Sequence, residues 1–245
     1  MEPSRYLDLI LADSNTLLAS ARLDPGAAAP SCPGWTAADV AGHVAQVYEH
    51  KVLCMTLGHE PPAEERKPLP TPGPALWAFF ISTRDALLEQ LTERGPAQPS
   101  FTWFPPDQSV GFWFRRMALE TAIHRVDAEL ATGTNTAIDP DLAVAGIDEM
   151  IDFLTYDFGD SPTLTAGANR TVRLQTHTRR WALTLRANGV DRAHEDTPPD
   201  AQITATPEDL LLHLWNRDPG NAPVTEWGDP AALATLAARI SEETQ

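Results

Sequence analysis

Three residues combine the types and the spacing needed to bind a divalent metal ion. Glu120 and His124 are four residues apart in a segment with helical periodicity, so both side chains are expected on one helix face. His43 interrupts the apolar face of another expected helix, between Val40 and Val47. Two neutral imidazoles and one carboxylate fill three of the four positions around a zinc ion and leave one open, as in catalytic zinc sites.

Each of these residues also has a purely structural interpretation. A single inward-facing histidine is more often a hydrogen-bonded core residue than a metal ligand. A carboxylate inside a bundle is costly unless it is paired, and Glu120 could pair with Arg116, one turn earlier. The same donor set also suits non-haem Fe(II), so the residue types leave the metal open.

Two charged residues on the helix of Glu120 and His124 have two interpretations each. Arg116 either holds an anionic group of a substrate or neutralises Glu120. Asp127, one turn after His124, either accepts a hydrogen bond from the imidazole and orients it or pairs with Arg125 or solvent.

The helix of His43 carries two further residues of interest. His50 lies two turns beyond His43 on nearly the same face, where it either lines a substrate pocket or packs. Cys54 lies three turns beyond His43, about 16 Å along the axis, too far to bind the same ion. Cys32 precedes the helix and is interpreted as part of a loop.

Five helices are expected to position these residues. Apolar residues recur at helical spacing in five segments, separated by loops rich in proline and glycine. Thr36 followed by Asp39 predicts a capping box at the start of the second segment. The five segments cover about residues 4–22, 36–54, 75–94, 112–130 and 140–158.

The periodicity changes after residue 159. Residues 171–177 and 180–186 alternate with period two and predict a hairpin, and residues 201–204 predict a third strand. Two further helices are expected, one from Pro207 and one over residues 230–241. The sequence therefore predicts an all-α bundle of four to five helices over residues 1–160 and a small α+β domain over residues 161–245.

The chain has 245 residues, 34 acidic and 18 basic, and a formal charge of −16 at pH 7. Binding to nucleic acid or to an anionic membrane needs a basic surface, so neither is an expected partner. No apolar stretch is long enough to span a bilayer, and residues 1–5 lack the pattern of a secretory signal. Two cysteines are too few for a secreted disulfide framework. We expect a cytoplasmic protein, and the sequence does not determine its oligomeric state.

Three segments resemble signatures of the mycothiol-dependent maleylpyruvate isomerase family, whose bundle belongs to the DinB-like superfamily. The first is CPGWTAADVAGH at residues 32–43, and the second is RMALETAIHRVDAE at residues 116–129. The third is EDLLLHLWNR at residues 208–217. The resemblance implies a DinB-like bundle, a divalent metal, usually zinc, on His43, Glu120 and His124, and a catalytic role for Arg217.

The resemblance also implies an activity. An open zinc position can stabilise the thiolate of a low-molecular-weight thiol, here mycothiol, for S-transfer to a small electrophile or for its thiol-assisted isomerisation. Two alternatives stay open: a zinc hydrolase that uses metal-bound hydroxide, and a non-catalytic regulator that binds metal or thiol. Arg217 could also simply complement the C-terminal end of its helix.

Overall fold

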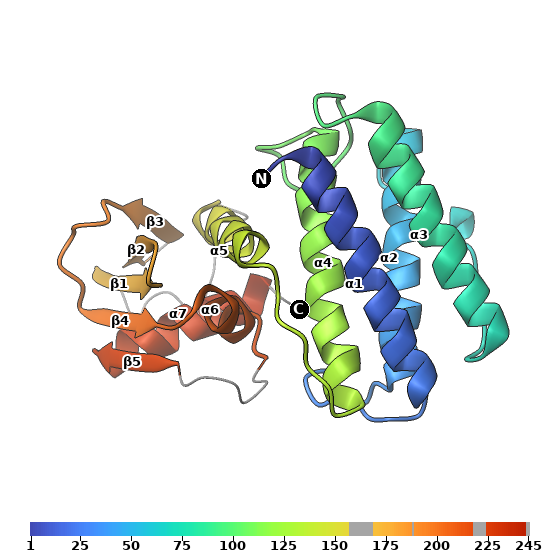
Figure 1. Cartoon of the computed structure of the whole chain (residues 1–245). Coiled ribbons are helices and arrows are strands. Elements are labelled where there is room, and N and C mark those ends of the chain that lie inside the picture. The colour runs from blue at the N-terminus through green and yellow to red at the C-terminus, as the bar shows by residue number, and fades with distance from the viewer. Residues whose placement is uncertain (157–168, 188, 218–223, 244–245) are drawn as a thin grey trace. The chain divides into compact units, whose positions relative to one another are not determined.

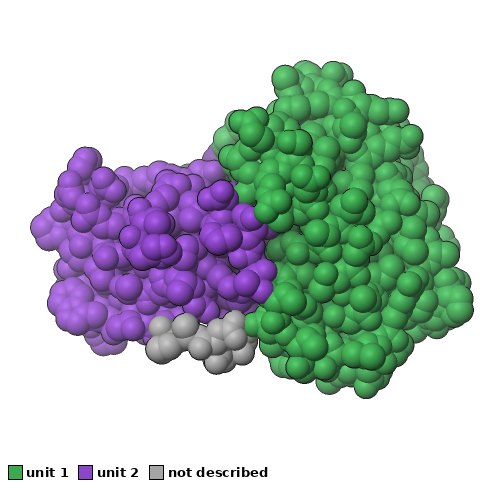
Figure 2. Space-filling model, in the orientation of Figure 1, with its two compact units in different colours: residues 1–136 green, residues 137–245 purple. Residues whose placement is uncertain are grey.

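Four long helices form the first of two compact units, residues 1–136 and 137–245, into which the chain divides (Figure 2). The computed structural model describes residues 1–156, 169–187, 189–217 and 224–243. The long helices run side by side (Figure 1), with a short 3₁₀ helix at Ala63–Glu65 between the second and the third. Their bounds are α1 Pro3–Leu23, α2 Ala37–Leu57, α3 Pro74–Arg94 and α4 Val110–Ala131.

Helix α4 packs against the other three helices of its unit and buries most of its side chains. Apolar residues such as Trp113 and Met117 have no exposed surface. Polar residues on the same helix are buried as well, including Asp127 and Glu129. A buried charge must find a partner, so the polar side chains of α4 are expected to form ion pairs or bind a ligand inside the unit.

Helix α2 begins at the predicted capping box. The Thr36 side chain accepts a hydrogen bond from the backbone N–H of Asp39. The Asp39 carboxylate accepts one from the backbone N–H of Thr36. Two of the unpaired N–H groups at the helix start are thereby satisfied, which fixes where α2 starts and therefore where its side chains point.

The loop that follows α2 folds back along the same helix. Glu49 accepts a hydrogen bond of 2.8 Å from the backbone N–H of Lys67. A methyl group on Gly42 would lie 3.1 Å from Cδ2 of Leu69. Glycine therefore allows the loop to approach α2 directly beside His43.

In its described residues, the second unit combines a mixed five-stranded sheet with three helices (Figure 1). The strand order is β3-β2-β1-β4-β5; β1 and β4 are parallel and the other neighbours antiparallel. The strands are β1 Arg170–Gln175, β2 Arg180–Arg186, β3 Gly189–Ala193, β4 Ala201–Thr204 and β5 Thr225–Gly228. The helices are α5 Pro140–Thr155, α6 Pro207–Leu214 and α7 Pro230–Glu243.

The predicted fold class is confirmed: a helical bundle precedes an α+β part. The hairpin of β1 and β2 and the strand β4 lie where the alternation predicted them. Strands β3 and β5 were not predicted, because both are edge strands with little apolar alternation. Only Val190 is buried in β3, and no residue is buried in β5.

Helix α5 lies in the second unit, so the compact units differ from the predicted ranges, 1–160 and 161–245. It packs against α6, α7 and β3. Trp181 of β2 donates a 2.7 Å hydrogen bond from its indole nitrogen to Asp148 of α5. The apolar face of α5 is thus covered by elements of the second unit. Helical periodicity predicts that such a face exists but not which unit covers it.

None of the helices in the described part of the chain has the length and apolar composition needed to cross a bilayer.

Candidate metal centre

The three predicted ligands converge from α2 and α4. His43 Nε2 lies 3.0 Å from Glu120 Oε1, and His124 Nε2 lies 3.3 Å from the same oxygen. The centroids of the two imidazole rings are 4.7 Å apart. One potential ligand atom from each residue lies within 4.8 Å of the other two, so a single ion can reach all three.

The surroundings of Glu120 compensate for its burial. Only 14% of its side chain is exposed, and Arg116 lies 2.6 Å from its second oxygen, Oε2. Burial alone would raise the pKa of Glu120, but His124, His43 and Arg116 hold it well below its usual range. This ion pair is the one that the second interpretation of Arg116 predicts, and a contact between Arg116 and a substrate stays a prediction.

His124 is affected in the opposite direction. Its side chain is 11% exposed, and burial alone would lower its pKa. The carboxylates of Glu120 and Asp127 nevertheless raise the pKa of His124 well above its ordinary value. A bound cation would take the place of the proton on Nε2 and balance the same carboxylates.

The donor set fits a divalent ion of the zinc type. Two imidazole nitrogens and one carboxylate oxygen are ligands that Zn²⁺ accepts, and three protein ligands leave a position open for another molecule. The side chain of His43 is 35% exposed, so the ligand set is not sealed from solvent. The indole of Trp35 lies beside both imidazoles. Its centroid is 5.0 Å from the ring of His43 and 6.4 Å from that of His124.

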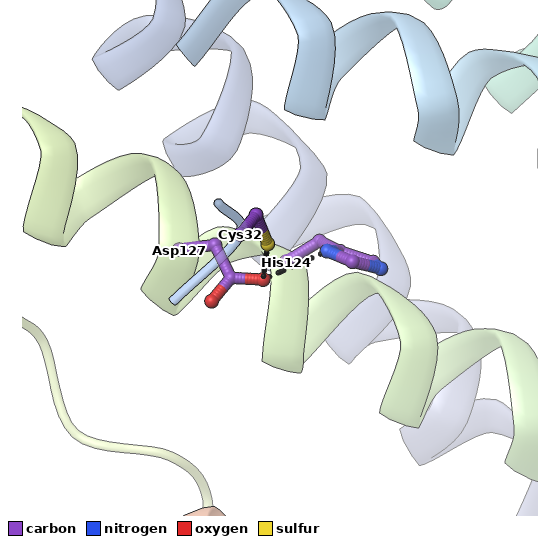
Figure 3. Close-up of side chains that lie close together, drawn as sticks. All are labelled: Cys32, His124 and Asp127. Carbon is purple, nitrogen blue, oxygen red and sulfur yellow. Dashed lines mark hydrogen bonds and ion pairs between the residues drawn. The ribbon is translucent and has the colours of Figure 1, made fainter. Parts of the chain in front are cut away.

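Asp127 and Cys32 lie on the other side of the His124 ring (Figure 3). Oδ2 of Asp127 lies 2.9 Å from Nδ1 of His124, and the Cys32 thiol donates to the same oxygen at 3.3 Å. This contact matches the first of the two interpretations of Asp127. Sequence reasoning placed Cys32 in a loop and missed its position, because no periodicity relates residues 95 positions apart. Cys32, His124 and Asp127 form a second group able to hold a cation.

His50 belongs to a separate cluster on α2. Its Nε2 lies 2.7 Å from Glu60, its Nδ1 lies 2.8 Å from Nζ of Lys51, and Cys54 is 4.0 Å away. Burial raises the pKa of the Cys54 thiol to about 11, which keeps it protonated and unreactive. Both ring nitrogens of His50 are engaged within the protein, so its contact with a substrate stays a prediction.

Arg217 follows α6 in the second unit. Its guanidinium donates a 2.7 Å hydrogen bond to the carbonyl oxygen of Trp215. It borders a cavity of about 210 Å³ whose lining includes Leu214, Leu236 and Glu226. The predicted role of Arg217 in an active site stays a prediction.

Comparison with known proteins places both units in one family. The profile of the mycothiol maleylpyruvate isomerase N-terminal domain matches residues 7–129, and that of the MDMPI C-terminal domain matches residues 141–235. The chain belongs to the mycothiol maleylpyruvate isomerase family. The junction between the two matched domains precedes α5, which agrees with the division into compact units.

Solved structures of this family share the fold. The crystal structure of the mycothiol-dependent maleylpyruvate isomerase is 14% identical, with a TM-score of 0.57. The match covers 92% of this chain and 93% of that one. A mutant of that isomerase, in which alanine replaces a histidine, matches with the same values. None of the curated proteins compared with the chain matches it.

Proposed function

We propose that this protein is a metal-dependent enzyme that uses a low-molecular-weight thiol, mycothiol, as cosubstrate. It transfers the thiol to a small electrophile or uses it to isomerise one. The observation that carries the proposal is the convergence of His43, Glu120 and His124, whose ligand atoms lie within 4.8 Å of one another. The family supports it, since its solved relative is named a mycothiol-dependent isomerase.

Each residue of the centre has a task in this proposal. His43, Glu120 and His124 hold the divalent ion, Zn²⁺ being the ion that best suits two imidazoles and a carboxylate with an open position. Asp127 keeps a proton on Nδ1 of His124, so that Nε2 is the nitrogen presented to the ion. When bound there, the ion supplies positive charge that favours the thiolate form of a coordinating thiol.

The second unit contributes a candidate contact for an anionic group. Arg217 carries a planar guanidinium that can bind a carboxylate through two parallel hydrogen bonds. We assign it the role of holding an anionic group of the substrate or the thiol. This assignment depends on the resemblance of residues 208–217 to the family signature.

A cobalt-substituted sample tests the proposal directly. Adding mycothiol should produce a sulfur-to-Co²⁺ charge-transfer band, and S-methyl mycothiol, which has no thiol proton to lose, should not. The variant Cys32→Ser is the matched control, because it removes the sulfur of the cysteine that lies in one cluster with His124. Turnover of electrophiles without thiol would support a hydrolase instead. The absence of both the charge-transfer band and turnover would support a regulator.

A further inference from the structure

Lys51 is a partly buried cation that packs against an aromatic ring. The chain has only two lysines, Lys51 and Lys67, and an excess of acidic residues. Nζ of Lys51 lies 5.1 Å from the ring centroid of Trp113 and 2.8 Å from Nδ1 of His50. Within the described residues, no carboxylate oxygen lies at ion-pair distance from this ammonium group. Lys67, in contrast, is exposed.

A hydrogen-bonded relay holds the ammonium group in place. The ammonium has no acceptor lone pair, so it donates to Nδ1 of His50. The proton of the neutral imidazole is then on Nε2, which donates to Glu60 at 2.7 Å. A cation bound at Nδ1 of His50, the ring nitrogen that faces Cys54, would have to displace Lys51. We therefore interpret this cluster as a support for Lys51 and not as a second metal site.

The position of Lys51 relates it to the metal centre. Along α2 it follows His43 by eight residues, about 12 Å of helix rise. Along α4, Trp113 precedes Glu120 by seven residues, two turns earlier on the same face. The charges of Glu120 and Arg116 both act on Lys51. The ammonium group thus lies over Trp113, which is on the α4 face that also carries Glu120.

Burial of this kind is unfavourable unless an anion compensates for it. Loss of solvent is the largest influence on the pKa of Lys51 and lowers it. Packing against Trp113 does not require a charge, since a methionine side chain would fill similar space. A carboxylate that reached Nζ would form a charge-assisted hydrogen bond in a poorly solvated place, where such bonds are strong.

We propose that Lys51 is a specificity-determining residue that binds a carboxylate of the electrophilic substrate while the thiol is at the metal centre. The inference rests on the proposed function for the identity of the reaction, but the binding of the carboxylate can be tested without turnover. Arg116 neutralises Glu120, whereas Lys51 supplies the positive charge that the substrate meets.

The presence of two lysines makes a direct binding test possible. Zinc-loaded protein labelled with ¹³C at lysine Cε gives two side-chain NMR signals, assigned with the variant Lys67→Arg. The probe is monomethyl succinate, which has one carboxylate and is not electrophilic; its control is the uncharged dimethyl succinate. We expect monomethyl succinate to shift the Lys51 signal with at least tenfold higher affinity than dimethyl succinate, and to leave the Lys67 signal unchanged. Equal affinities, or no shift of the Lys51 signal, would overturn the assignment.

Variants separate specificity from folding. Lys51→Met should remove the preference for the charged ester, Lys51→Arg should restore it, and Lys67→Met should leave it unchanged. Circular dichroism and metal content verify the fold of each variant, and Lys51→Gln replaces Lys51→Met if that protein does not fold. A preference retained in both uncharged variants would assign the carboxylate to another cation.

A kinetic arm uses the electrophilic counterparts, monomethyl fumarate and dimethyl fumarate. In each, the mycothiol sulfur forms a bond to one alkene carbon, the C=C π bond breaks, and the thiol proton ends on the neighbouring carbon. Lys51→Met should raise KM for the monomethyl ester about tenfold and leave KM for the dimethyl ester unchanged. A tenfold rise for both esters would contradict a role in specificity. If neither ester reacts, the function proposed above fails for these electrophiles, and the NMR titration still decides the role of Lys51.

Discussion

Oδ2 of Asp127 lies 2.9 Å from Nδ1 of His124, and the Asp127 side chain has no exposed surface. A buried carboxylate in this position keeps the proton on Nδ1 and makes Nε2 a more basic ligand. Replacing Asp127 with Asn preserves the shape and removes the charge. We expect Asp127→Asn to lower metal affinity roughly 10- to 100-fold, measured by competition with a chromophoric chelator.

Cys32→Ser is the control for this variant, because serine still offers a hydrogen-bond donor to the same carboxylate oxygen. Its metal affinity should stay close to that of the native protein. If Asp127→Asn folds normally and binds metal as tightly as the native protein does, Asp127 does not support a metal ligand.

The three proposed ligands can be tested one at a time. His43→Ala, Glu120→Ala and His124→Ala each remove one of three protein ligands, so purified variants should contain little of the divalent ion that the native protein holds at about one per chain. His50→Ala is the matched control, because His50 lies on the same helix but in another cluster. Elemental analysis measures the content. Undiminished metal in all three ligand variants would disprove the assignment.

The pKa shifts predict how pH affects the protein after a chelator has removed its metal. The pKa of Glu120 is lowered from 4.5, so its stabilising contribution is present above that value and lost as pH falls. The pKa of His124 is raised from 6.5, so its contribution is present below that value and lost as pH rises through the raised pKa. For this pair, the melting temperature should be highest between pH 4.5 and 6.5.

Thermal unfolding at a series of pH values measures this effect, and His124→Gln isolates the histidine. The variant should lose the decrease in stability that the native apoprotein shows above pH 6.5. Metal binding should strengthen over the same range, since His124 must release a proton to bind an ion. An apoprotein whose melting temperature rises steadily above pH 6.5, in parallel with that of His124→Gln, would contradict the raised pKa.

Local geometry determined which parts of the centre could be predicted from the sequence. Helix geometry relates Glu120, His124 and Asp127 over one or two turns, so their shared face follows from their spacing. The approach of His43 from another helix depends on tertiary packing, and the family resemblance supplied it. Cys32 lies in an irregular segment between α1 and α2, where no periodicity indicates which side chain it meets. Lys51 became a candidate only when its surroundings were known.

Arg217 has two candidate roles: it stabilises the C-terminal end of its helix, or it binds a carboxylate. Its guanidinium bonds to the Trp215 carbonyl, just beyond the end of α6. A cation there stabilises a helix C-terminus by only about 0.3–1 kcal/mol, and a lysine supplies the same charge. A carboxylate clamp requires the planar pair of donors, which lysine does not have. The variant Arg217→Lys therefore gives different results under the two roles.

If Arg217 only complements its helix, Arg217→Lys should have nearly native stability and activity. If Arg217 binds an anionic group of the substrate or the thiol, the variant should keep its melting temperature and metal content. Its kcat/KM should then fall about tenfold or more, equivalent to about 1.4 kcal/mol of transition-state binding. Arg217→Ala should lose at least as much, because it removes the charge as well. The assay is thiol-dependent turnover of an electrophile that the native protein accepts. Full activity in both variants would show that the second unit does not act through this residue.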